Sequence, residues 1–148
     1  MERAQYKLNV GKIEEGFVID HISPGRAMRL YRHLGLDSIN CAVAIIQNAY
    51  SAKMGKKDMI KVESPIEGFD LDTIAFLDHN ATVDIIKDGE IKDKPTLTLP
   101  EKVVNVIKCK NPRCITSSEH ELDHVFLLTD REKGTYRCCY CETRYKEP

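Results

Sequence analysis

The sequence predicts an α+β protein in two parts: a ferredoxin-like split β-α-β sandwich over residues 1–97, then a small all-β, zinc-ribbon-like domain over residues 98–148. Three observations predict it. The first part alternates strand-like and helix-like segments in the order β-α-β-β-α-β. Pro95 and Pro100 bracket a stretch typical of a stiff linker. The last forty residues contain two closely spaced cysteine pairs.

The first half of the sandwich is expected to contain two strands around one helix. Residues 16–22 are apolar and β-branched, which predicts a buried strand. Residues 23–24, Ser-Pro, are expected to begin a helix with serine as the N-cap, and Gly35 is expected to end it. Residues 39–46 predict a second buried strand, and the small polar residues 48–54 predict a hairpin loop.

The second half of the sandwich repeats the pattern and adds an edge strand. Residues 57–63 alternate between two faces, as a half-buried strand does. Residues 68–70 are expected to begin a second helix, and residues 81–86 form the fourth strand. Asp-Gly at 88–89 is a hairpin turn signal, so residues 90–94 should return as a short fifth strand.

Four cysteines in two short pairs predict a metal site in the second part. Cys109 and Cys114 have C-x4-C spacing, Cys138 and Cys141 have C-x2-C spacing, and 23 residues separate the pairs. Zn²⁺ accepts four thiolates in a tetrahedron, and two tight turns can each supply two of them. The sequence therefore predicts one structural zinc ion with no coordination position left open for water or substrate.

A disulfide pair or free core thiols are the alternatives to a metal site. Residues 1–10 lack the apolar core of a signal peptide, so a cytoplasmic location is expected, where metal ligation is favoured over disulfides. Cys139 is expected to be a free thiol because its spacing to Cys141 is too tight for a metal turn. His120 and His124 lie in a polar stretch and are expected to be solvated.

Composition weighs against several function classes. The 148 residues carry a net charge of −1, and the longest apolar run, residues 41–46, is far too short to span a bilayer, so no membrane association is expected. Residues 101–148 contain nine Lys or Arg and eight Asp or Glu. They lack the basic face that a nucleic-acid-binding zinc ribbon normally carries, so that function remains the alternative rather than the leading hypothesis.

The first part contains no catalytic signature but does contain a group of lysines. GxSxG, P-loop and dinucleotide-binding motifs are absent, so the chain is not expected to be an enzyme. Lys57 and Lys61 share one strand face and Lys94 ends a neighbouring strand, so three ammonium groups could hold a triphosphate, with Asp20 and His21 contacting a base or ribose. The alternatives are a solvated face that protects a sheet edge, an aspartate that caps the next turn, and a structural histidine.

In combination, these segments resemble the regulatory chain of aspartate carbamoyltransferase. The resemblance covers the chain from about residue 6 to the C-terminus. The segments that carry it are VIDHI at 18–22, MGKKDMIKVE at 54–63, ATV at 81–83, LPE at 99–101 and the two cysteine pairs, the second followed by Glu142. Each is weak alone, but their order and separations are specific.

The resemblance implies a non-catalytic subunit of an enzyme of pyrimidine biosynthesis. In that family the N-terminal domain binds ATP, which activates, and CTP, helped by UTP, which inhibits. The same domain pairs two regulatory chains through its sheet, and the zinc domain holds the catalytic chain. The usual assembly has six catalytic and six regulatory chains. We hypothesise that the 95–100 linker, stiffened by its prolines, transmits a small shift between the domains. A stand-alone nucleotide sensor with a different partner is a competing hypothesis.

Functional residues can be carried over from the family by position. The resemblance implies nucleotide contacts at Lys12, Ile13, Val18, Asp20, His21, Lys57, Lys61, Asp84, Ile86, Ile91 and Lys94. It implies contacts with the catalytic chain at Asn111, Arg113 and Glu142. Three positions depart from the family pattern, because Asp84 and Arg113 replace Asn and Gly89 replaces Tyr. A carboxylate at position 84 would repel phosphate or change the hydrogen bonds offered to a base, so effector preference stays open.

Overall fold

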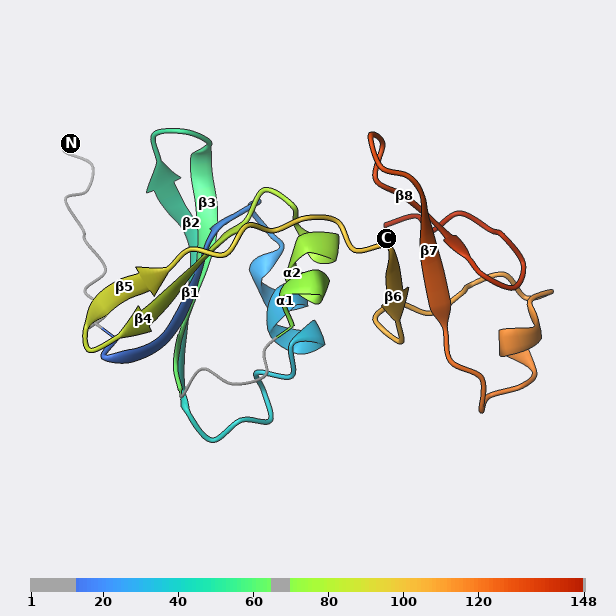
Figure 1. The fold of residues 1–148 in the computed structure, drawn as a ribbon, viewed down its shortest axis with the longest axis horizontal. Coiled ribbons are helices and arrows are strands. Elements are labelled where there is room, and N and C mark those ends of the chain that lie inside the picture. Colours follow the sequence, from blue (N-terminus) through green and yellow to red (C-terminus); the bar gives the residue numbers. More distant parts are fainter. Residues whose placement is uncertain (1–12, 65–69, 148) are drawn as a thin grey trace.

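The computed structural model describes residues 13–64 and 70–147, which form two antiparallel sheets joined by a strand-free linker (Figure 1). The first sheet has five strands in the order β2-β3-β1-β4-β5, and the second has three in the order β6-β7-β8. The first domain contains β1 (Glu15–Ile22), α1 (Ala27–His33), β2 (Ala42–Ser51), β3 (Gly55–Glu63), α2 (Leu71–Leu77), β4 (Thr82–Lys87) and β5 (Glu90–Asp93). The second contains β6 (Lys102–Val104), the 3₁₀ turn Ile115–Ser117, β7 (Val125–Asp130) and β8 (Thr135–Cys138). The predicted α+β class and element order are confirmed.

Side-chain alternation along β3 separates a buried face of the first sheet from an open one. Asp58, Ile60 and Val62 are at most 1% exposed, and they point toward the helices. Lys57 and Lys61 lie on the opposite face and are half-buried. The two helices lie on the side of the sheet nearest the second domain (Figure 1), so the opposite face, called the open face below, points away from that domain.

The two helices begin in different ways, and one prediction about them is wrong. Asp70 lies in the segment expected to begin α2 and is its N-cap, since its carboxylate accepts the backbone N–H groups of Asp72 and Thr73. Residues 65–69, which include most of the segment expected to start this helix, lie outside the described residues. Ser23 does not cap α1, whose N-cap is Arg26. The buried carboxylate of Asp78 accepts the Ser23 N–H at 2.7 Å instead, so residues 23–25 form a turn before the helix.

The second strand lies at a sheet edge and is longer and more exposed than expected. β2 runs to Ser51, and none of the hydrophobic residues in its first half is fully buried, because it has a neighbour on one side only. A bulge at Asn48, with φ of +58°, lets the strand continue through residues predicted as loop. The hairpin loop therefore shortens to residues 52–54. The predicted turn between β4 and β5 is confirmed, with positive φ at both Asp88 and Gly89.

An aromatic contact joins the two domains. Phe76 of α2 packs edge-on against Tyr136 of β8, with ring centroids 4.7 Å apart. Burial raises the pKa of Tyr136 to about 12, so its hydroxyl stays protonated and donates to the Pro100 carbonyl at 2.5 Å. Arg26 adds an ion pair with Glu147 at 2.8 Å. The linker therefore ends at a fixed point on the second domain.

Both described helices have seven residues, and neither is long and apolar enough to cross a membrane. The core of the first domain is built mainly from strand residues such as Ile19, Ile22 and Val83, which are at most 1% exposed. The helices close this core on one side, and the linker and second domain extend beyond them (Figure 1).

Candidate functional site

The four paired cysteines converge on one point of the second domain. Cys109 and Cys114 lie in the loop after β6, and Cys138 and Cys141 lie at the end of β8 and in the turn that follows. Their sulfur atoms all lie within 4.8 Å of one another. The closest pairs, Cys109–Cys141 and Cys114–Cys138, are 3.6 Å and 3.8 Å apart. Each close pair takes one sulfur from each loop, so both loops are needed to build the group.

These separations fit a metal ion and do not fit disulfide bonds. A disulfide joins its sulfurs at about 2.05 Å. Four sulfurs placed about 2.3 Å from a central ion in a tetrahedron would be about 3.8 Å apart, which agrees with the observed pairs. The group is half-buried or buried at every member, and four protein sulfurs complete a tetrahedron. The site therefore suits a structural ion.

Hydrogen bonds around the sulfurs fix the two loops. Thr116 Oγ1 lies 3.1 Å from Cys114 Sγ, and Thr143 Oγ1 lies 3.2 Å from Cys141 Sγ. His124 Nδ1 accepts the backbone N–H of Cys109 at 3.1 Å. The expectation that His124 is simply solvated is therefore wrong, because its ring orients a metal-binding loop without joining the sulfur group. His120, expected to be solvated as well, is exposed.

The electrostatic environment divides the sulfurs into two kinds. Burial raises the pKa of Cys109 to about 12 and also raises that of Cys138. The Thr116 hydroxyl and backbone lower the pKa of Cys114. Burial opposes ionisation of Cys141, but hydrogen bonds with Thr143, Asn111 and Cys109 together outweigh it and lower the pKa to about 6. Holding all four as thiolates therefore requires a cation at the centre.

The three residues predicted to face the catalytic chain border this four-cysteine group. Asn111 accepts the backbone N–H of Arg113 at 3.0 Å and donates to Thr143 Oγ1 at 3.1 Å, so its side chain holds the first loop together. The side chains of Arg113 and Glu142 are exposed. Glu142 has φ of +64°, the conformation that lets the chain turn after Cys141. Cys139 is exposed and lies outside the sulfur group.

Residues predicted to contact a nucleotide meet on the open face of the first sheet. Val18 of β1 is flanked by Lys61 of β3 on one side and Asp84 of β4 on the other. Two residues further along β1, the Asp20 carboxylate oxygen Oδ1 lies 2.9 Å from Nζ of Lys57 on β3. Both side chains of that ion pair are 17% exposed. Three adjacent strands thus place two lysines and two carboxylates on one surface.

The remaining predicted residues lie around this cluster with different exposure. Lys94 is exposed, with Nζ 3.5 Å from Asp84 Oδ1. His21 has φ of +113° at a bulge in β1, and its Nδ1 lies 3.0 Å from Thr82 Oγ1. Ile86 pairs with Ile91 across the β4–β5 hairpin, and Ile91 is 51% exposed. Ile13 is buried, whereas Lys12 lies outside the described residues.

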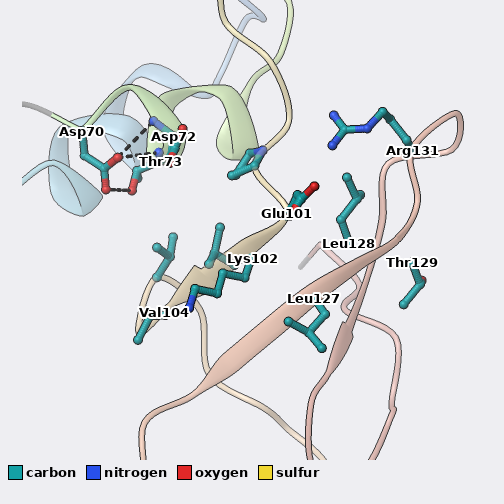
Figure 2. A pocket seen from close by; sticks show the side chains of 13 residues that line it. Asp70, Asp72, Thr73, Glu101, Lys102, Val104, Leu127, Leu128, Thr129 and Arg131 are labelled. Atoms are coloured by element: carbon teal, nitrogen blue, oxygen red, sulfur yellow. Dashed lines mark hydrogen bonds between the residues drawn. The ribbon is translucent and has the colours of Figure 1, made fainter.

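A large hollow between the two domains was not anticipated from the sequence. Its volume is about 1060 Å³, and it lies between the start of α2 and the strands β6 and β7 (Figure 2). Asp70, Asp72 and Thr73 line one wall, and Lys102 and Leu127 are among the residues of the other. None of the residues predicted to bind nucleotide or metal lines it. No sequence motif marks it, because it arises from how the two domains meet.

Comparison with known proteins assigns both domains. A family model described as the allosteric domain of the aspartate carbamoyltransferase regulatory chain matches residues 8–98. A second, described as the metal-binding domain of the same chain, matches residues 101–148. The regulatory chain of Clostridium botulinum strain Hall is 46% identical over 138 residues, covering 93% of this chain and 94% of the relative.

Two further relatives extend this likeness. The regulatory chain of Clostridium tetani is 45% identical over 139 residues, covering 94% of this chain and 96% of the relative. That of Bifidobacterium longum is 38% identical over 139 residues, covering 94% of this chain and 99% of the relative. All three are aspartate carbamoyltransferase regulatory chains by name.

The sheet with its two helices and the four-cysteine group define a two-domain regulatory protein, with an allosteric domain and a metal-binding domain. The chain belongs to the family of aspartate carbamoyltransferase regulatory chains. The family name implies a catalytic chain as its partner. The resemblance drawn from the sequence is confirmed, and the nucleic-acid-binding alternative is not favoured.

Proposed function

We propose that the open face of the first sheet binds the effectors ATP, CTP and UTP and that the bound nucleotide regulates the partner's activity. The observation that carries this proposal is the register of β3, β1 and β4, which sets Lys61 and Asp84 on either side of Val18. Lys57 and Lys94 extend the cationic surface, and each already neutralises a carboxylate. Lysine ammonium groups are suited to phosphates as point charges, and the apolar Val18 and Ile86 suit a base or ribose.

The ion of the second domain is proposed to be a single structural zinc. All four donors are cysteine sulfurs, a set that selects soft or borderline ions such as Zn²⁺. Its sulfurs are Cys109, Cys114, Cys138 and Cys141, and the ion would supply folding energy to a three-stranded domain with a small core. We further propose that residues 1–97 form the nucleotide-binding domain and residues 98–148 the zinc-binding domain.

The chain is proposed to be non-catalytic and to act within a cytoplasmic assembly of six catalytic and six regulatory chains. The metal-proximal residues Asn111, Arg113 and Glu142 would face the catalytic chain. The edge strand β2 supports pairing of two regulatory chains, because it is bonded on one side only and carries Tyr50, which is 81% exposed.

Transmission between the domains is proposed to pass through the Phe76–Tyr136 contact and the linker that ends at Pro100. The domains are packed at this contact, whereas the hollow beside the first turn of α2 leaves room for a small rotation (Figure 2). A nucleotide can bias two quaternary states only by its difference in affinity between them, typically about 1–3 kcal/mol.

The proposal is tested by co-purifying this chain with its catalytic chain and measuring aspartate saturation with ATP, with CTP and with neither. The half-saturating aspartate concentration should shift in opposite directions with the two nucleotides, while the isolated chain turns over no substrate. A chain that binds nucleotide but does not co-purify with the catalytic chain would instead support the stand-alone sensor.

Replacing Lys61 with alanine is expected to weaken ATP and CTP binding by about tenfold, because one ammonium group is lost from a partly desolvated phosphate site. Isothermal titration calorimetry of the full chain measures the change. Lys56→Ala is the matched control, since Lys56 lies on the same strand but projects from the opposite face. Equal loss of affinity in both variants would argue against the open face as the phosphate site.

Replacing Asp84 with asparagine is expected to strengthen triphosphate binding by about three- to tenfold. The substitution removes a negative charge beside the proposed phosphate site and releases Lys94, which lies 3.5 Å from the Asp84 carboxylate. The gain should be larger for ATP than for adenosine, because only the nucleotide carries the repelled charge. Competition binding with both ligands checks this, and an equal gain for adenosine would contradict the electrostatic explanation.

A further inference from the structure

A second hollow between the two domains lies directly beside the aromatic contact that joins them, because Phe76 and Tyr136 both line it. Its volume is about 330 Å³, near the lower end of the roughly 300–1,000 Å³ that small-molecule sites occupy. Residues of α1 and the end of α2 form one side, and the β7–β8 turn and the C-terminal segment form the other. None of the residues assigned above to nucleotide, metal or catalytic-chain contact is among those that line it.

The permanently charged residues of this hollow, called the arginine hollow below, are mostly cations. They are Arg26, Arg29, Arg131 and Lys133, against Glu132 and Glu147. Glu147 is already neutralised by Arg26, at 2.8 Å. Among residues 13–64 and 70–147, no carboxylate lies within ion-pair distance of Arg29, Arg131 or Lys133. Three cations without a counter-charge therefore border one small space, on a chain whose net charge is −1.

Hydrogen bonds hold two of these guanidinium groups at the hollow, and they come from different domains. Arg29, half-buried on α1, donates to the Tyr145 hydroxyl. Arg131 donates to the Leu99 carbonyl at 2.9 Å, and Figure 2 shows its side chain extending from the turn after β7 toward the linker. A guanidinium has five N–H donors, so each group keeps donors for a ligand. Positioned guanidinium groups suit phosphate, because two N–H groups can bind two of its oxygens at once.

We propose that the arginine hollow binds a small phosphate-bearing anion between the two domains, at a site separate from the open face. Its volume suits inorganic phosphate or a small phosphate monoester rather than a whole nucleoside triphosphate. Arg29 belongs to the first domain and Arg131 to the second, so one anion held by both would bridge the domains. Because Phe76 and Tyr136 line the same hollow, the anion would also stiffen the contact proposed to transmit the nucleotide signal. Only this last consequence rests on the proposed function.

The test titrates inorganic phosphate into the isotope-labelled full regulatory chain and follows backbone amide shifts by NMR, with sodium chloride keeping the ionic strength constant. Amides of residues 26–29 and 131–134 should shift along one binding curve, with a Kd of about 1 mM or below. Arg131→Gln should weaken binding by about tenfold, since charge-assisted hydrogen bonds are lost. Arg137→Gln is the matched control, because Arg137 is also exposed and donates to one backbone carbonyl, that of Glu142 at 3.1 Å, but does not line the hollow. It should change the Kd by less than about twofold.

A second variant is expected to gain affinity, which misfolding could not produce. Glu132 is exposed at the hollow, and no cation of residues 13–64 or 70–147 lies within ion-pair distance of it. Glu132→Gln should therefore strengthen phosphate binding by about threefold, because it removes a repelling charge. Metal content and melting temperature verify the folding of every variant. If Arg131→Gln fails to fold, Lys133→Gln replaces it, with an expected loss of about threefold.

The outcomes of the titration decide the inference without the catalytic chain, so they do not depend on the proposed function. Hollow amides that stay unmoved up to about 20 mM phosphate would overturn it. Equal affinities in the Arg131, Glu132 and Arg137 variants would overturn it as well. Shifts confined to β1, β3 and β4 would assign the phosphate to the open face, which would overturn the inference and support the proposed nucleotide site.

Discussion

Replacing Cys114 with serine is expected to unfold the second domain and release the catalytic chain. Cys114 is 3% exposed and its sulfur lies 3.8 Å from that of Cys138 across the two loops, so its loss opens the tetrahedron at one of its two buried corners. Structural zinc contributes about 10–16 kcal/mol to the folding of small metal domains. The core of this domain contains few fully buried hydrophobic side chains, among them Val103 and Phe126, and cannot compensate for that loss.

Three measurements test the Cys114→Ser prediction. Metal content should fall well below one ion per chain, amide protection in β6–β8 should disappear, and binding to the catalytic chain should weaken by more than about a hundredfold. Protection in the five-stranded sheet should remain, because the first domain has its own core. Cys139→Ser is the matched control, since Cys139 is exposed beside the same turn and outside the sulfur group. Full assembly and CTP inhibition by a metal-free chain would refute the structural role.

Replacing Asp58 with alanine is expected to cost about 3–5 kcal/mol of stability in the first domain. This carboxylate is fully buried and accepts three backbone N–H groups, from Gly25 at 2.9 Å, Ala27 at 3.3 Å and Asn48 at 3.0 Å. Alanine would leave all three donors without a partner in the core, at about 1–3 kcal/mol each before relaxation. The melting temperature should fall by at least about 10 °C.

The effect of the Asp58 change should be local as well as large. Gly25 lies in the turn that follows Asp20 and His21, and Ala27 begins α1 directly after it, so the proposed nucleotide binding should weaken together with stability. Amide exchange should increase first in residues 23–27 and at the bulge of β2. Asp37→Ala, a change of the same type at an exposed position, should alter the melting temperature by less than about 2 °C. Equal effects from the two variants would mean that the three hydrogen bonds contribute little.

The local sequence pattern predicted most helices and strands correctly, because at those positions the tertiary contacts favour the same structure as the local sequence. The alternation in β3 and the Asp-Gly turn at 88–89 are set within a few residues, and both were predicted correctly. The start of α1 was predicted wrongly for the opposite reason. Ser23 has the chemistry of an N-cap, but the helix N-cap lies three residues later, and Asp78, 55 positions away, holds the Ser23 backbone N–H in the turn before it. β2 was misjudged because edge position depends on strand order, which the strand itself does not encode.

Some features of the candidate sites could likewise be predicted from the local sequence, and others could not. Short cysteine spacing predicted the convergence of four sulfurs, because each loop determines the position of its own pair. The role of His124 could not be predicted, since it depends on a contact with Cys109, 15 positions away in the sequence. The pairing of Lys57 with Asp20 and of Lys94 with Asp84 likewise appears only once β1, β3 and β4 are placed side by side.

Those two ion pairs have a consequence for how the open face would respond to a ligand. At Lys57 and Lys94 an arriving phosphate would compete with Asp20 and Asp84, which already hold these lysines. Each contact with these two lysines would replace an existing ion pair, so the net gain there is the small difference between two similar interactions. Such a surface would bind its ligand weakly and reversibly, so its occupancy would follow the cellular nucleotide concentration as it rises and falls.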